Sequence, residues 1–294
     1  MTGESSIKFT ALEPHPGFAM TLTPVPLAPV ADLSTTSRRR SVARLIEPLE
    51  ELTRTSPYLL RTSVRTRPND DASLLPRYIF LGPRGGDAPI RIGIFASIHG
   101  DEPEGAQAVV EFIQQLDQNP TLATGYVLFI YPVCNPHGFE NDSRYAQSGR
   151  DLNREFWNNS EEPEVQLLQD DLTHHGLQGI LSLHSDDTSE GLYGFVRGVT
   201  LSKHLLEPAL ARASRFLPRN QNPLIDGFPA TNGIIHQGYP GILSPPRGMG
   251  PRPFEIVFET PATAPAAHQR QAFLAALHSV LEEYRKFISY GANL

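Results

Sequence analysis

The sequence contains a single cysteine, Cys134, among 294 residues, so a disulfide within the chain is impossible. It also lacks a basic excess, because 25 Lys and Arg stand against 32 Asp and Glu, which gives a formal net charge of −7. A chain without a basic excess has little with which to neutralise phosphates. The composition therefore argues against broad binding to nucleic acid or to an anionic membrane.

Three further signals are missing from the sequence. No uninterrupted apolar run approaches the ~18 residues of a membrane-spanning helix. The N-terminus, MTGESSIKFTALEPHPGF, has no basic region followed by an apolar core, so it does not resemble a secretory signal, and we expect a cytoplasmic protein. Neither the GxSxG motif of many serine hydrolases nor the HExxH motif of many zinc proteases occurs.

The composition changes near residue 38. Residues 1–38 are rich in Pro, Thr, Ser and Ala, which predicts an extended or flexible N-terminal arm. Residues 39–294 are predicted to form a single catalytic domain. The basic run SRRRS that joins the two is interpreted as a solvated helix start rather than a nucleic-acid patch.

Apolar strand-like segments alternate with amphipathic segments from residue 77 onward. This alternation predicts an α/β fold, with a sheet that helices cover on both faces. Residues 218–253 hold many Gly and Pro and are expected to form loops around a site. The predicted strands are 77–83, 90–98, 125–133, 178–184 and 253–260, and the predicted helices are 41–54, 103–116, 162–176, 201–217 and 264–288.

Four of the apolar strands end in a polar residue that a core cannot use. These residues are His99, Asn135, His184 and Glu259. In open α/β sheets, ligands bind beyond the carboxyl ends of the strands. If the strands are neighbours, all four side chains face one crevice.

Two histidines and a carboxylate are the ligands with which zinc keeps a position open for water. His99 and Glu102 are separated by three residues across the turn from strand to helix, and His184 is the candidate third ligand. Glu259 is the candidate base. The simpler alternative is a polar turn, with Asp101 as an ordinary acid at the start of a helix.

Arginines are frequent in the segment CNPHGFENDSRYAQSGRDLNREFW. Beside a metal site, arginine suits a bidentate clamp on a substrate carboxylate or the stabilisation of an oxyanion. The alternative is a surface loop of ion pairs in which Arg150 and Asp151 are partners.

The order of these motifs, H-x-x-E, NPHG, R, DLNR, LHS and FET, resembles that of the zinc carboxypeptidase superfamily over about residues 40–288. That superfamily includes the succinylglutamate desuccinylase and aspartoacylase branch. The resemblance implies a mixed, mostly parallel, twisted eight-stranded sheet between helices, of the phosphorylase/hydrolase-like type. It also implies one zinc ion, held by His99, Glu102 and His184.

The resemblance further implies roles for residues around the metal. Glu259 matches the catalytic glutamate, and Arg144 matches the arginine that stabilises the oxyanion. Asn153 and Arg154 match the pair that binds the substrate carboxylate, and Asn135 is placed in the same crevice.

One segment departs from the carboxypeptidase pattern. Where carboxypeptidases carry a mobile tyrosine in a YQ pair, this sequence has IIHQGYPG, so His236 occupies the tyrosine position. Tyr239, three residues later, is a possible substitute. Leu243 falls near the specificity position and offers no charge. These three residues are expected to contact the substrate.

Three functional hypotheses remain open at this point, and two of them are enzymatic. The first is a metallocarboxypeptidase-like hydrolase that cleaves the amide bond next to a carboxylate-bearing residue of a peptide. The second is a deacylase of N-acyl amino acids. The third is a non-catalytic zinc-binding or ligand-binding protein, against which the complete set of ligands, base and arginines argues. The expected partner is a small peptide or an N-acyl amino acid, and the sequence does not indicate the oligomeric state.

Overall fold

The computed structural model describes residues 39–65, 74–85, 88–236 and 252–291, which belong to one structural unit, Arg39–Leu294. The predicted arm, residues 1–38, lies outside the described residues. Among the described residues, none of the helices combines the length and the apolar composition that crossing a lipid bilayer requires.

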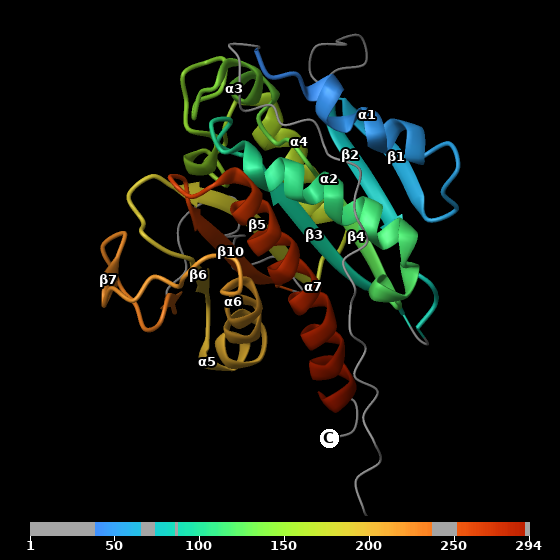
Figure 1. The fold of residues 1–294 in the computed structure, drawn as a ribbon. Helices are drawn as coiled ribbons and strands as arrows, with labels where there is room; N and C mark the ends of the chain where they lie inside the picture. Colours follow the sequence, from blue (N-terminus) through green and yellow to red (C-terminus); the bar gives the residue numbers. More distant parts are fainter. Residues whose placement is uncertain (1–38, 66–73, 86–87, 237–251, 292–294) are drawn as a thin grey trace, which may run out of the picture. The chain divides into compact units, whose positions relative to one another are not determined.

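An eight-stranded sheet forms the centre of this unit (Figure 1). Strands β4, β3, β5 and β10 pair in parallel, as do β6 and β9, whereas β1–β2, β2–β4 and β10–β6 are antiparallel. The predicted mixed sheet with a parallel centre is therefore confirmed. In spatial order the strands are β1 (Leu59–Arg65), β2 (Leu74–Leu81), β4 (Tyr126–Tyr131), β3 (Ile90–Ala96), β5 (Gly179–Asp186), β10 (Phe254–Pro261), β6 (Tyr193–Val196) and β9 (Ile234–Ile235).

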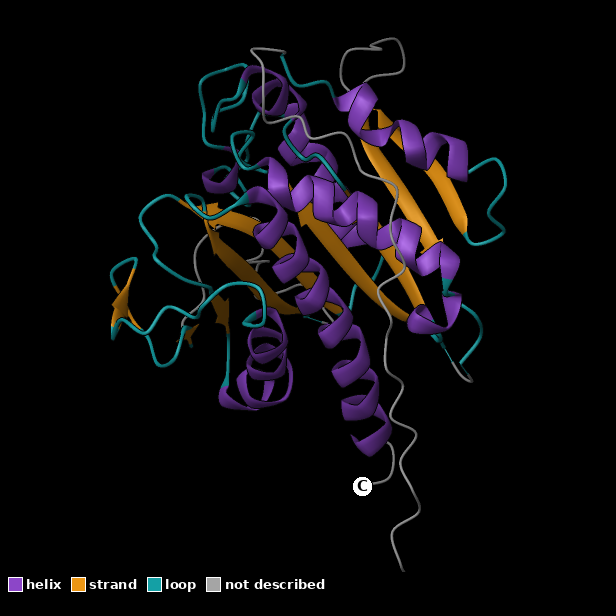
Figure 2. Cartoon of the chain, viewed as in Figure 1, coloured by secondary structure: helices purple, strands orange, loops and turns teal. Residues whose placement is uncertain are grey.

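Helices cover both faces of the sheet (Figure 2). On β3, Ile92 and Ile94 join the core beneath one set of helices, whereas Phe95 joins a second core beneath α4. Successive side chains of a strand point to opposite faces, so a strand buried on both faces is apolar at nearly every position. The first set is α1 (Val42–Leu52), α2 (Pro103–Gln118), α6 (Glu207–Ala213) and α7 (Ala266–Gly291), and α4 spans Pro163–His174.

The predicted helix over 201–217 is interrupted. It consists of α5 (Val199–Leu201), a π-helical turn over Ser202–Leu206, and α6, which ends at Ala213. Pro208 lies in the first turn of α6 and has no N–H to donate to the carbonyl four residues earlier. The hydrogen-bond ladder therefore changes its spacing just before the proline.

The basic run before α1 is anchored to the body of the domain. Arg39 donates to Asn141 Oδ1 at 2.9 Å, and Arg40 pairs with Asp142 at 2.6 Å and donates to the Gly100 carbonyl at 3.0 Å. Asn141 ends the short helix α3 (Pro136–Asn141). The two arginines thus tie the N-terminal end of the domain to the loop that carries His99.

Candidate active site

Three of the four polar strand ends meet at one edge of the sheet. Strands β3, β5 and β10 are adjacent and parallel, so their carboxyl ends lie together. His184 and Glu259 are paired directly across β5 and β10. His99 lies three residues beyond the end of β3. The shared direction of the strands is the reason that residues far apart in sequence converge.

The turn from β3 to α2 brings His99 and Glu102 together. Ser97 adopts a left-handed backbone conformation (φ 48°), and its Oγ donates to the Glu102 carbonyl at 3.0 Å. Gly100 packs directly on the backbone of Gly138, where an added Cβ would lie 1.9 Å from the Gly138 carbonyl carbon. The glycine in HGDE is therefore required by contact with the glycine in NPHG.

The ligand atoms of His99, Glu102 and His184 all lie within 4.8 Å of one another. His99 Nδ1 is 2.7 Å from Glu102 Oε1, His184 Nδ1 is 3.1 Å from Glu102 Oε2, and the two Nδ1 atoms are 3.3 Å apart. The three side chains are buried, with 3%, 6% and 3% of each residue exposed. These are the three residues that the sequence predicted as metal ligands.

Neighbouring groups fix the orientation of the three side chains. His99 Nε2 lies 3.2 Å from Asp151 Oδ1, so the Asp151 carboxylate can hold the ring with Nδ1 turned toward Glu102 and His184. The backbone N–H of Ser185 donates to Glu102 Oε2 at 3.0 Å. A carboxylate behind a histidine and hydrogen bonds to a coordinating carboxylate are typical of metal sites.

Charge and burial set the protonation of these groups. Burial alone would raise the pKa of Glu102, but interactions with His184 and His99 lower it. Burial lowers the pKa of His184, and Glu102 opposes this only partly. Burial would also lower the pKa of His99, but hydrogen bonds to Asp151 and Glu102 raise it. A metal ion would bind the Glu102 carboxylate and the neutral rings of His99 and His184, so binding it competes with protons at these three groups.

The donor set fits a zinc ion. Two ring nitrogens and a carboxylate converge on one small volume, and these are borderline-soft and hard donors that zinc accepts together. In the absence of a cation or a proton, the lone pairs of the two ring nitrogens and of the Glu102 carboxylate would point at one another. His99, Glu102 and His184 would hold the ion and leave a further position for a substrate or water.

Glu259 lies beside the triad and is partly exposed to the cavity. Burial raises the pKa of its carboxyl well above the usual range, and the nearby charges of Glu102, Asp186 and Asp226 act in the same direction. Arg144 opposes the shift. A carboxyl beside a cavity with a raised pKa is a candidate for proton exchange with a ligand of that cavity.

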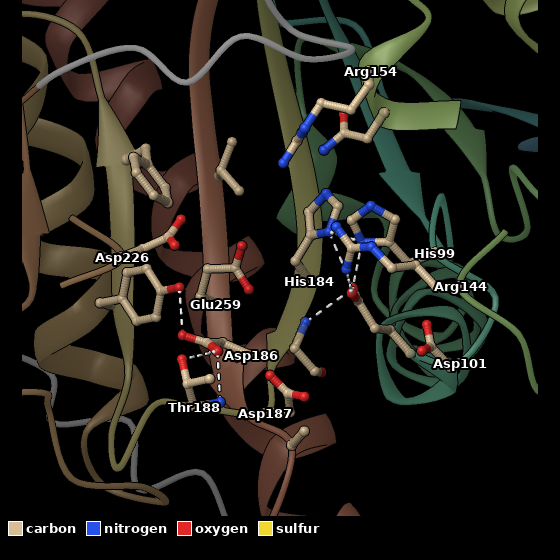
Figure 3. A pocket seen from close by; sticks show the side chains of 17 residues that line it. His99, Asp101, Arg144, Arg154, His184, Asp186, Asp187, Thr188, Asp226 and Glu259 are labelled. Atoms are coloured by element: carbon tan, nitrogen blue, oxygen red, sulfur yellow. Dashed lines mark hydrogen bonds and ion pairs between the residues drawn. The ribbon is translucent and has the colours of Figure 1, made fainter. Parts of the chain in front are cut away.

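A cavity of about 340 Å³ opens over these residues (Figure 3). In Figure 3, Arg144 and Arg154 lie on the same side of Glu259 as His184, and Asn153 also lines the cavity. Arg144 Nη2 is 3.1 Å from Asp151 Oδ2, and Nη1 is 3.7 Å from Glu102 Oε1. The predicted oxyanion and carboxylate-binding residues therefore line the same cavity as the triad.

The structure does not bring every predicted substrate residue to this cavity. Asn135 is fully buried, its Oδ1 accepts from Gly138 N at 2.8 Å, and its Nδ2 donates to the carbonyls of Ile98 and Arg144, each at 3.4 Å. Its amide is used to hold the loops that carry His99 and Arg144, so its placement in the crevice is corrected to a position beneath it.

Of the three substrate residues predicted in and after the segment IIHQGYPG, the structure describes only His236. His236 is exposed just after β9 and is not among the residues that line the cavity. Tyr239 and Leu243 lie outside the described residues. Their expected contact with the substrate therefore stays a prediction.

The ion pairs of the DLNR segment differ from the surface-loop alternative. Arg150 pairs with Glu155 at 3.1 Å and with Glu162 at 3.6 Å, whereas Asp151 faces His99 and Arg144. The sequence signal for Asp151 was its position two residues before Asn153. Its side chain also accepts from Asn153 N at 2.9 Å, which caps the short 3₁₀ helix Leu152–Arg154.

The wall of the cavity that β6 helps to form was not predicted from the sequence. This wall contains Asp186, Tyr193, Phe195 and Asp226. Asp186 follows His184 by two residues on β5, and that period of two was a usable signal. Asp226 comes from the loop-rich segment 218–253, which was expected to border a site, but its residue type alone gave no indication.

Comparisons with known proteins agree with this geometry. A sequence model of the succinylglutamate desuccinylase/aspartoacylase catalytic domain matches residues 89–226. No curated protein matches the sequence of the chain. The family match covers His99, Glu102, Arg144 and His184, and it ends before Glu259.

Solved structures show the same fold at low sequence identity. A candidate metallopeptidase from Shewanella denitrificans OS217 has a TM-score of 0.68 at 19% identity, and the match covers 85% of this chain and 98% of that chain. A metallo-carboxypeptidase from Burkholderia cenocepacia has a TM-score of 0.62 at 16% identity, over 84% of this chain and 70% of that chain. A metallo-carboxypeptidase from Pseudomonas aeruginosa in complex with (2-guanidinoethylmercapto)succinic acid has a TM-score of 0.54 at 19% identity, over 82% and 68%. The chain therefore has the fold of these metallopeptidases and metallo-carboxypeptidases, and its resemblance to the succinylglutamate desuccinylase/aspartoacylase catalytic domain covers residues 89–226.

Proposed function

We propose that this protein is a zinc-dependent amide hydrolase that cleaves the bond next to a carboxylate-bearing residue of a peptide. The observation that carries the proposal is the convergence of the His99, Glu102 and His184 ligand atoms within 4.8 Å in a cavity that Glu259 and Arg144 also line. A zinc ion at such a site supplies Lewis acidity, which polarises a carbonyl and acidifies a water.

The side chains of the cavity divide the remaining work. Asn153 and Arg154 bind the substrate carboxylate, which places the scissile amide beside the triad. Arg144 stabilises the negative charge that develops on the carbonyl oxygen. Glu259 accepts a proton from the attacking water and gives it to the leaving nitrogen, so that the C–N bond is replaced by a C–O bond and an amine is released.

A second candidate is a deacylase of N-acyl amino acids. The match of residues 89–226 to the succinylglutamate desuccinylase/aspartoacylase domain supports this reading as well as the first. Both reactions hydrolyse an amide and release a free amine, so the same side chains serve either one. The two readings differ in whether the acyl group is a peptide or a small acid.

Glu259→Gln tests the proposal because it keeps the size of the side chain and removes its basicity. The zinc-loaded parent is assayed on a panel of dipeptides and on N-acetyl and N-succinyl amino acids, and bound zinc is measured. We expect Glu259→Gln to bind zinc and to lose turnover by about 10²-fold or more. Glu51→Gln, an exposed position on α1, is the matched control and should keep full activity.

The outcomes separate the alternatives. Turnover restricted to dipeptides favours the peptidase, and turnover restricted to N-acyl amino acids favours the deacylase. A zinc-loaded protein that is inert on the whole panel would point to the non-catalytic binding protein. Full activity of Glu259→Gln would show that Glu259 does not transfer the proton.

A further inference from the structure

The turn that carries His99 and Glu102 is held by a residue from the N-terminal end of the domain. Arg40 Nη1 donates to the carbonyl of Gly100 at 3.0 Å, across a separation of 60 residues in the chain. Gly100 lies between the two candidate metal ligands and also packs on the backbone of Gly138 in α3. The peptide group at the middle of the turn is therefore fixed from two sides.

The guanidinium of Arg40 has a defined place between α3 and this turn. Its Nη2 pairs with Asp142 Oδ1 at 2.6 Å, and only 23% of the Arg40 side chain is exposed. The guanidinium carbon lies 5.9 Å from the centre of the Phe139 ring, which is within the range of a cation–π contact. A planar group with several donors can make these contacts and reach the Gly100 carbonyl at the same time.

The chain that carries Arg40 is docked on the body of the domain immediately after this residue. Val42 N donates to Glu140 Oε1 of α3 at 3.1 Å. Leu45 and Leu49 of α1 are buried in the same core as Phe139. Arg40 therefore connects a packed helix, α1, to the backbone of the metal-binding turn.

Other hydrogen bonds hold the two ends of the turn. Ser97 Oγ donates to the carbonyl of Glu102 at 3.0 Å, and Asn135 Nδ2 donates to the carbonyl of Ile98 at 3.4 Å. These donors are neutral, whereas the donor from Arg40 is charged, and a charge-assisted hydrogen bond is about twice as strong as a neutral one. The contact from Arg40 is thus a substantial part of what fixes the spacing of the two ligands.

We infer that Arg40 is a positioning residue of the candidate metal site, through which the N-terminal end of the domain strengthens the binding of zinc. The inference rests on the zinc site of the proposed function and concerns the regulation of that site. Arg40 acts through the Gly100 peptide, which sets the distance between His99 and Glu102. Coupling between two sites is reciprocal, so zinc strengthens the attachment of α1 by the same factor. Cleavage of the chain after Arg40 would therefore weaken zinc binding.

Competition titrations with zinc on the full chain measure the first half of this coupling. Arg40→Gln removes the charged donor, and we expect the affinity for zinc to fall about tenfold, as for other residues that orient metal ligands. The visible absorption of the Co²⁺-loaded protein should change as well, because it depends on coordination geometry. Arg40→Lys should recover part of the affinity, since one ammonium can still donate to the Gly100 carbonyl.

Arg44→Gln is the matched control, because it removes one guanidinium from an exposed position on α1. It should change neither the zinc affinity nor the Co²⁺ spectrum. If Arg40→Gln does not fold, Arg40→Lys makes the same comparison, with an expected loss of about threefold. Zinc affinity and a Co²⁺ spectrum equal to those of the parent in the folded Arg40 variant would overturn the inference.

Hydrogen–deuterium exchange measures the other half of the coupling. Zinc should slow exchange of the α1 amides in the parent by up to about tenfold, and by much less in Arg40→Gln. A residue that only stabilises the fold would lower Tm and leave the zinc affinity and this protection unchanged. Such a result would overturn the inference.

These measurements need no substrate, so they separate this inference from the proposed reaction. If zinc binding depends on Arg40 but no amide is hydrolysed, the proposed reaction fails and the inference stands. If amides are hydrolysed and Arg40→Gln binds zinc as tightly as the parent, the reaction stands and the inference fails.

Discussion

Gln269→Leu is expected to destabilise the protein and weaken the candidate zinc site together. Gln269 lies on α7 with only 2% of its surface exposed. Its Oε1 accepts from the hydroxyls of Ser185 at 3.1 Å and Thr260 at 2.8 Å. Its Nε2 donates to the carbonyls of Ala262 at 3.3 Å and Ala264 at 2.8 Å. One side chain therefore connects the ends of β5 and β10, next to His184 and Glu259.

The size of the effect follows from the partners that leucine would leave behind. Leucine has a similar volume, so cavity formation contributes little. The hydroxyls of Ser185 and Thr260 lie 3.0 Å apart, so one can donate to the other and only one of them loses its acceptor. The carbonyls of the exposed Ala262 and the half-buried Ala264 can take water in place of the lost donor, so each lost hydrogen bond costs about 0.5–1.5 kcal/mol. The free energy of unfolding should fall by about 1–3 kcal/mol, which corresponds to a decrease in Tm of about 2–10 °C for a domain of this size.

Chemical and thermal denaturation of the metal-free protein measure the first effect, and a zinc titration measures the second. Zinc should bind several-fold more weakly, because the Ser185 N–H that holds Glu102 belongs to the disturbed strand end. Gln118→Leu, at the exposed end of α2, is the control and should change neither quantity. If Gln269→Leu matched the control in both measurements, the network would have no organising role and the reasoning would be refuted.

Three further predictions follow from the contacts around the site and in the helical layer. Asp151→Asn weakens the hold on the ring of His99, so zinc affinity in a competition titration should fall about 10–100-fold, and an unchanged affinity would contradict the role of this contact. Arg144→Lys should reduce kcat by about 10²-fold or more with little change in bound zinc, because a single ammonium does not reproduce the guanidinium; normal kcat would exclude it as the oxyanion group. Burial, helped by Arg212, lowers the pKa of His278 from 6.5 to about 4, so the unfolded chain takes up a proton before the folded protein does as the pH falls. The stability that neutral His278 contributes is then fully present above pH 6.5 and is lost toward pH 4, by about 3 kcal/mol at most. Denaturation of His278→Gln across this range should show a free energy of unfolding that changes less with pH than that of the parent.

The elements that the sequence predicted well are those with a strong hydrophobic period or a continuous apolar run. Helices α2, α4 and α7 and the central strands β3, β4, β5 and β10 belong to this group. Strand β1, with the sequence LLRTSVR, lies at the edge of the sheet and mixes polar with apolar residues. Strand β6 has only 4 residues and depends on its pairing with β10 rather than on a pattern of its own. Edge position and short length explain why neither was predicted.

Part of the candidate site could be predicted from the sequence because it lies within a few consecutive residues. His99 and Glu102 are three residues apart, and the glycine between them signals a tight backbone contact. His184 and Glu259 could be added because each ends an apolar strand, and parallel neighbours end at the same edge. Asn135 shows the limit of that argument, since a polar residue at a strand end can be turned inward to satisfy backbone groups instead.

The sequence by itself determined the α/β class, the residues that could bind a metal, and the family resemblance, because each of these depends on residue type and spacing along the chain. Only the tertiary structure decided which groups surround those residues. Asp151 faces His99 rather than Arg150 because of how the loop 150–154 folds back on the triad. Asp226 reaches the cavity because a hairpin packs on β6 through Phe228. Contacts of this kind arise from side-chain packing between segments far apart in the chain, and no local pattern encodes them.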